Sequence, residues 1–425
     1  MAGKQGVRID YLMKLPQGLT VAYDDHGSLG TMAIGIFIGA GSRDEGPEQE
    51  GAAHFLEHLA FKGAGDHNSR QIAELMDGLG GEVNAYTTRD YTCFYAKVLS
   101  PMALTAWELL WDLVRNPWLA EGDLDRERNV VQEELLEAWD DVEDRCEMAY
   151  MQSLYQDHQM THDILGTPET IKGLSWDTIK SFYRQHYTPA NMLVAIAGEG
   201  TMALLENIRK LDNIVGGEAP SRLKPVPAPS HVHYHHKAEQ LQILLGAPAP
   251  LLTQDEYPAA LLLSTLLGGQ NSSRLWQRLR ETEGLVYTVS TGYNAQADWG
   301  ELSIHMALNP GSLASALSAT KSEVEQFIAH GPEAHEVQRA LAQLTTSLAF
   351  TRETPDGRMF RLGRYGLLGQ VPQSGDLLLD QLTRVTPRQV QTLAETLFGD
   401  WSRVAVGTAG NLPREWRNLR DFLIN

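Results

Sequence analysis

A repeated order of predicted elements constrains the fold of this chain more than any other feature. In both halves, strands come first, followed by helices, a hairpin, more helices and a last strand. The first-half strands and hairpin are expected at residues 18–23, 32–38, 82–98 and 192–198. Their second-half counterparts are expected at residues 240–247, 286–308 and 403–407. The repeat indicates duplication of one structural unit.

The segment between the halves is rich in glycine and proline, which is typical of a linker. We therefore predict a first domain over residues 1–212, a linker over 213–229 and a homologous second domain over 230–425. Because hairpins join most of the strands, each domain is expected to be α+β. Each should have a mostly antiparallel sheet with helices packed on one face.

The composition narrows the functional class. The chain has 425 residues, of which 43% are hydrophobic, so it can bury large cores. No apolar run approaches the roughly 18 residues of a transmembrane helix, and the start has no secretory pattern. We expect a cytoplasmic protein with no membrane partner. The net charge of -19 argues against nucleic acid as a partner. It would either attract basic or amphipathic peptides or only aid solubility.

The motif with the clearest chemistry is His54-Phe55-Leu56-Glu57-His58, an H-x-x-E-H sequence. On a helix, His54 and His58 lie one turn apart on the same face, so both rings can reach one metal ion. Glu57 lies beside them and can hold a water bound to that metal. This inverted zincin motif predicts metal-assisted hydrolysis, most often of peptide bonds.

Two histidines and a water leave a zinc ion short of one protein ligand, which is commonly a carboxylate. An acidic segment over residues 123–139 supplies candidates, and its apolar residues repeat at helical spacing at Val131, Leu135 and Ala138. Glu134 falls on that apolar stripe, whereas Glu133 points about 100° away. We therefore predict Glu134 as the third ligand. Glu127, on the same face, could support the ligands.

A second histidine cluster comes just after the linker. His231, His233 and His235 would share one face of a strand, next to His236. They could form a second metal site or belong to a solvated strand. No carboxylate or cysteine is spaced to complete a site, which favours the solvated strand.

The chain resembles the family of pitrilysin, insulin-degrading enzyme and mitochondrial processing peptidase. The H-x-x-E-H motif and the two later glutamates match that family, and the likeness extends over nearly the whole chain. Other matching stretches are residues 41–45, 61–63, 80–87, 165–171, 187–192, 267–275 and 279–287. The length suits the short-chain branch, whose members carry two homologous domains and assemble as dimers.

This resemblance implies one zinc ion per chain, bound by His54, His58 and Glu134. It implies that Glu57 is the general base that activates the zinc-bound water. Glu127 would be the accessory glutamate near the site.

The resemblance also assigns substrate contacts. Asn84, Ala85 and Tyr86 match the edge strand that pairs with the peptide backbone. Arg280 would contact a substrate carbonyl, and the Tyr287 hydroxyl would stabilise the oxyanion. In the short-chain dimers this pair usually comes from the facing subunit.

Two functions follow from these assignments. The first is a zinc endopeptidase that cleaves short or unfolded peptides in a chamber closed by two subunits, most simply a homodimer. The alternative is a catalytically silent or partner-dependent subunit that binds peptides or acts as a scaffold with a homologous chain. Retention of Glu57 favours the first, because a structural zinc site needs no base.

Overall fold

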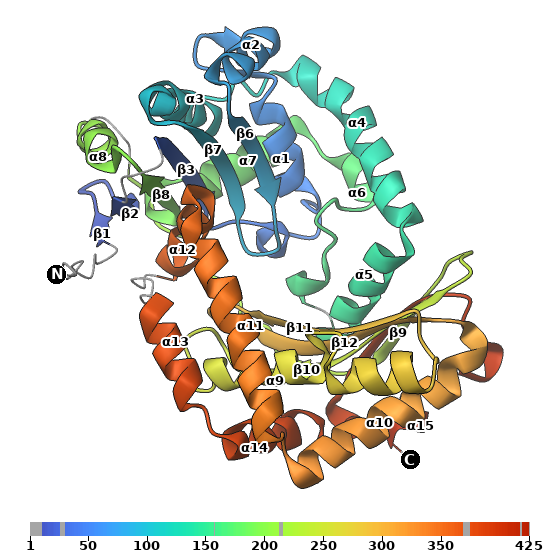
Figure 1. The fold of residues 1–425 in the computed structure, drawn as a ribbon. Helices are drawn as coiled ribbons and strands as arrows, with labels where there is room; N and C mark the ends of the chain where they lie inside the picture. Colours follow the sequence, from blue (N-terminus) through green and yellow to red (C-terminus); the bar gives the residue numbers. More distant parts are fainter. Residues whose placement is uncertain are drawn as a thin grey trace, which may run out of the picture. The chain divides into compact units, whose positions relative to one another are not determined.

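A computed structural model describes residues 11–25, 30–156, 158–211, 216–368, 375–416 and 419–424 (Figure 1). It divides into two compact units, each built from three segments. Unit 1 comprises residues 1–135, 162–222 and 349–375, and unit 2 comprises residues 136–161, 223–348 and 376–425.

In the described part of unit 1, six strands form one sheet. Their spatial order is β1 (Tyr11–Lys14), β2 (Thr20–Asp25), β8 (Met192–Gly198), β3 (Thr31–Ile38), β7 (Thr92–Leu99) and β6 (Glu82–Thr87). Strands β2 and β8 run parallel, and every other neighbouring pair is antiparallel. A short ribbon pairs β4 (Gly63–Ala64) with β5 (His67–Asn68). The outer strand β6 leaves one sheet edge open.

Helices cover both faces of this sheet. On one face, Met359 and Leu362 of α12 pack against Ala33 and Phe37 of β3. Residues Ile34 and Ile36 point the other way because side chains alternate along a strand. The helices of unit 1 are α1 (Ala52–Ala60), α2 (Ser69–Leu79), α3 (Ala103–Arg115), α4 (Glu121–Asp140, which ends in unit 2), α6 (Pro168–Gly173), α7 (Trp176–His186), α8 (Thr201–Arg209) and α12 (Pro355–Leu367).

Helix α1 is fixed at its start by a buried carboxylate. Glu45 accepts hydrogen bonds from the backbone N–H groups of Gly51 (2.9 Å) and Ala53 (2.7 Å). These donors would otherwise be unsatisfied at the helix N-terminus. Gly51 has a φ of 87°, which favours glycine. The apolar face of α1, including Phe55 and Leu56, is buried.

The described part of unit 2 contains a five-stranded sheet. Its order is β11 (Thr288–Ala295), β12 (Gly300–Leu308), β10 (Leu241–Pro248), β13 (Ala405–Gly410) and β9 (His231–His235). Only β13 and β9 pair in parallel. The helices of unit 2 are α5 (Val142–Leu154), α9 (Tyr257–Gly268), α10 (Leu313–His330), α11 (Ala334–Glu353, which ends in unit 1), α13 (Gly375–Arg384), α14 (Pro387–Phe398) and α15 (Leu419–Ile424).

This second sheet also has helices on both faces. Leu241, Ile243 and Leu245 of β10 belong to the large core formed with α9, α10 and α14. On the opposite face, α5 packs with Leu244. There the buried Tyr150 hydroxyl donates to the Glu301 carboxylate at 2.9 Å.

The predicted α+β class with largely antiparallel sheets is confirmed. The expectation that helices occupy one face is wrong, because each sheet also receives a helix from the other half of the sequence. Helix α5 precedes the linker but packs in unit 2, and α12 follows it but packs in unit 1. An amphipathic pattern shows that a helix has a buried face, not which sheet it covers.

The compact units therefore differ from the contiguous domains predicted over residues 1–212 and 230–425. Of the predicted linker, residues 213–215 lie outside the described residues, and the boundary between units falls at residues 222–223. Among the described helices, none is long and apolar enough to cross a membrane.

Candidate metal centre

Unit 1 brings together the three predicted metal ligands. His54 and His58 project from α1 with ring centroids 4.6 Å apart, and Glu134 comes from α4. The Glu134 carboxylate lies 3.3 Å from His58 Nε2 and 3.7 Å from His54 Nε2. One potential ligand atom from each residue lies within 4.8 Å of the others. The group could therefore hold one metal ion.

The chemistry of these donors fits zinc. Two imidazoles and one carboxylate, with a position left open, form a common catalytic zinc site. Burial, together with the neighbouring His58, lowers the pKa of His54 to about 3, so this ring is neutral as a ligand must be. Glu134 lies on the helix that carries the buried Val131 and Leu135, but its side chain is 46% exposed and faces the histidines.

Glu127, the predicted accessory residue, lies next to the ligand His58. Its Oε2 is 3.3 Å from His58 Nδ1, and its side chain is only 6% exposed. Its other oxygen pairs with Lys62 Nζ at 2.7 Å. Lys62 was not predicted as a site residue, although it lies in the stretch at residues 61–63 that matches the family. The lysine offsets the charge of a buried carboxylate.

Glu57 occupies a half-buried position next to the ligands. Burial raises the pKa of its carboxyl group, and a hydrogen bond from Thr87 opposes that rise. The Thr87 hydroxyl donates to Glu57 Oε2 at 2.5 Å. Thr87 was not predicted as a site residue. The contact joins a helix to a strand, so no local spacing could have indicated it.

The predicted substrate strand is β6, the outer strand of the first sheet. Along it, Asn84 and Tyr86 share one face, whereas Ala85 and Thr87 share the other. The Ala85 N–H donates to the Asn84 side chain at 2.9 Å. Tyr86 packs near Phe360 of α12, and its hydroxyl is 3.3 Å from that of Tyr91. An open edge of this kind is what strand addition requires.

Arg280 and Tyr287 both lie in unit 2. Arg280 belongs to a π-helical segment, Trp276–Thr282, and donates to the Val286 carbonyl at 2.9 Å. The Tyr287 backbone N–H donates to the Ala307 carbonyl at 2.8 Å. Its side chain is 51% exposed, so the phenol is accessible to a ligand.

The second histidine cluster lies on β9. His231 Nε2 and His233 Nδ1 are 3.1 and 3.0 Å from the Thr408 hydroxyl. Within the described residues, the only metal-capable group of three or more side chains is His54, His58 and Glu134. These contacts favour a strand in which Thr408 satisfies His231 and His233 over a second metal site.

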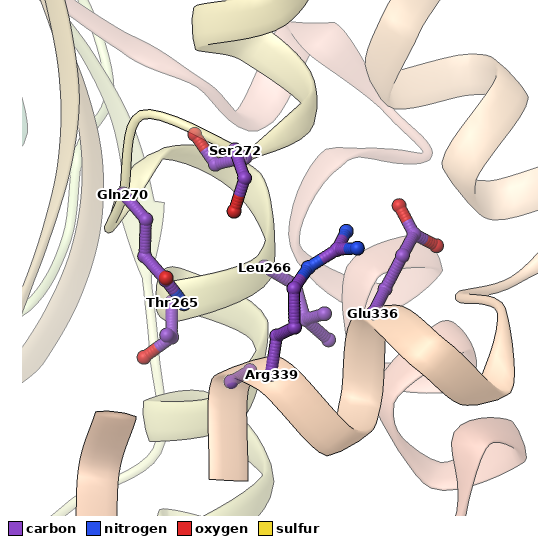
Figure 2. Close-up of a pocket in the computed structure, with 8 residues that line it drawn as sticks. Thr265, Leu266, Gln270, Ser272, Glu336 and Arg339 are labelled. Atoms are coloured by element: carbon purple, nitrogen blue, oxygen red, sulfur yellow. The ribbon is translucent and has the colours of Figure 1, made fainter. Parts of the chain in front are cut away.

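Unit 2 also contains a small pocket. Figure 2 shows Glu336 and Arg339 rising from α11 near Ser272, with Thr265 and Gln270 from α9 and the loop after it. None of the site residues predicted from the sequence lines this pocket.

This chain is similar to proteins that are named zinc proteases. Residues 20–168 match the family profile described as insulinase (peptidase family M16), and residues 173–344 match the profile described as the peptidase M16 inactive domain. Uncharacterized zinc protease YmxG of Bacillus subtilis is 30% identical, over 93% of this chain and 98% of its own length. An uncharacterized zinc protease of Mycobacterium leprae is 33% identical, over 95% and 93%.

Two solved structures share the fold. One is a peptidase M16 inactive domain from Pseudomonas fluorescens, with a TM-score of 0.87 and 20% identity, covering 95% of this chain and 98% of that one. The other is a protease from Helicobacter pylori, with a TM-score of 0.85 and 20% identity, covering 95% and 100%.

Proposed function

Because this chain belongs to the insulinase (M16) peptidase family, we propose that it is a zinc-dependent endopeptidase acting on short or unfolded peptides. The family resemblance found in the sequence is thereby confirmed. The observation that carries the proposal is the group of His54, His58 and Glu134, with Glu57 beside it on the same helix.

His54, His58 and Glu134 would hold the metal, and Glu127 would keep His58 oriented by accepting its Nδ1–H. When bound, zinc supplies Lewis acidity that polarises a carbonyl and acidifies a water. Lys62 pairs with Glu127 and so balances the negative charge that this carboxylate places next to His58.

Glu57 would act as the general base. Its carboxylate takes a proton from the attacking water and later delivers a proton to the amine leaving group. Burial raises the pKa of Glu57, which makes its carboxylate a stronger base. A glutamine at this position would keep the shape and remove the proton transfer.

The peptide would bind as an added strand along β6 at Asn84, Ala85 and Tyr86. Arg280 would contact a substrate carbonyl, and the exposed Tyr287 would stabilise the oxyanion. We propose a homodimer in which this pair acts on the site of the facing subunit. A chamber closed by two subunits would exclude folded proteins.

One observation supports an alternative. The second half matches a profile described as an inactive domain, which would also suit a chain that needs a homologous partner. Such a chain would be a silent or partner-dependent subunit. A purified homodimer that cleaves peptides alone excludes this alternative, whereas a chain inert until mixed with a homologous subunit supports it.

The proposed activity is tested by cleavage of a mixture of quenched fluorescent peptides. The untreated protein should cleave them, a chelator should abolish cleavage, and added zinc should restore it. A folded protein should be cut far more slowly than its unfolded form. Cleavage that persists after verified metal removal would contradict the zinc mechanism.

A further inference from the structure

One hydrogen bond links the proposed base to the proposed substrate strand. Thr87 is the last residue of β6, and its hydroxyl donates to Glu57 Oε2 at 2.5 Å. Thr87 shares its face of β6 with Ala85 and points toward α1. The strand that would bind the peptide backbone therefore also contacts the carboxylate that would move the proton.

This contact has no competitor among the described residues. Thr87 supplies the only side-chain hydrogen bond to Glu57 within the described residues, and the neighbouring His58 and Glu134 influence Glu57 without hydrogen bonding to it. The Glu57 side chain is half-buried, so fewer waters than at an exposed carboxylate are available to replace a lost donor. With Oε2 held, Oε1 remains available to the attacking water.

We propose that Thr87 is a positioning residue for the reaction, fixing the Glu57 carboxylate relative to a peptide held on β6. The inference rests on the proposed peptidase function. Thr87 touches no reacting atom, so it acts through Glu57. Its effect should appear in kcat, because the backbone groups of β6 that would hold the peptide do not depend on its hydroxyl.

The test compares Thr87→Val with Thr87→Ser. Valine keeps the β-branched shape that suits a strand, and serine keeps the hydroxyl. A hydrogen bond to a charged group contributes enough that Thr87→Val should lower kcat about 10- to 100-fold, with KM within about twofold. Thr87→Ser should retain kcat within about threefold.

A matched control is Thr20→Val. Thr20 begins β2 in the same unit, is half-buried, and its hydroxyl forms no hydrogen bond within the described residues. It should leave kcat and KM unchanged. Zinc content and thermal unfolding should be measured for all three variants.

The outcomes separate this inference from the proposed function. A wild-type chain that binds zinc but cleaves no peptide overturns both. An active wild type with an unchanged Thr87→Val overturns only the role of Thr87. Loss of zinc or a raised KM in Thr87→Val, or an equal loss in Thr87→Ser, would make Thr87 merely structural and also overturn it.

Discussion

His58 Nε2 lies 3.3 Å from Glu134 Oε2, which joins helix α1 to helix α4. The other ring nitrogen of His58 lies 3.3 Å from Glu127, on the same helix as Glu134. The His58 imidazole thus lies between two carboxylates, for which we propose different roles: Glu134 binds the metal and Glu127 orients the ring. When a metal binds at Nε2, the proton of the neutral ring is on Nδ1, and Glu127 can accept a hydrogen bond from that N–H.

The first prediction concerns this support. Glu127→Leu removes the acceptor for His58 Nδ1–H and should weaken zinc binding about 10- to 100-fold. Competition against a chromophoric chelator measures the change. Glu133→Leu, at an exposed position on the same helix, is the control and should bind zinc like the wild type. Equal zinc affinity in both variants would contradict the orienting role of Glu127.

The second prediction concerns the buried ion pair that packs near the start of α1. Arg43 and Asp90 are 2.8 Å apart with side chains 1% and 10% exposed. Arg43→Met should destabilise unit 1 by about 3–5 kcal/mol, because it leaves a buried charge without its main partner. Arg70→Met breaks an exposed pair of the same length and should cost less than about 1 kcal/mol. Chemical denaturation compares the two, and similar losses would contradict the argument.

The third prediction is a pH dependence of stability at Glu301. Burial raises the pKa of this carboxyl to about 7 from an ordinary value of 4.5, although Asn294 and Tyr150 hydrogen-bond to it. Below pH 4.5 the group is neutral in both states. Between pH 4.5 and 7 the unfolded state loses its proton first, so this residue lowers stability as pH rises.

Above pH 7, the raised pKa of Glu301 should lower the free energy of unfolding by about 3 kcal/mol. Glu301→Gln should therefore gain stability relative to wild type at pH 8 and little at pH 4.5. Denaturant unfolding at both values measures the difference. A constant difference between wild type and variant across this range would contradict the raised pKa.

The fourth prediction concerns the homodimer. If Tyr287 acts on the facing subunit, Glu57→Gln and Tyr287→Phe chains, each weak alone, should regain partial activity in mixed dimers. The mixed dimer has one site with both a wild-type base and a wild-type tyrosine. No recovery in verified mixed dimers would show that each site is built within one chain.

The sequence predicted the parts of this protein that depend on local spacing. The one-turn separation of His54 and His58 places both rings on one face of α1, and the helical stripe at Val131 and Leu135 identified the helix that carries Glu134. The hairpin of β6 and β7 also followed from local patterns.

Features that depend on packing between distant segments were not predictable. Thr87 meets Glu57 and Lys62 meets Glu127 only after strand and helix are assembled. The packing of α5 on the sheet of unit 2 and of α12 on the sheet of unit 1 is another such feature, because the apolar face of either helix could cover either sheet. The π-helical winding at Trp276–Thr282 likewise has no signal in the local spacing of the sequence.

The most direct test of the account compares wild type with Glu57→Gln on the same peptide mixture, with zinc measured in both. The account predicts equal zinc content, cleavage by the wild type and loss of nearly all cleavage in the variant. Undiminished cleavage by a zinc-loaded Glu57→Gln protein would contradict the central claim that Glu57 is the base of a zinc peptidase.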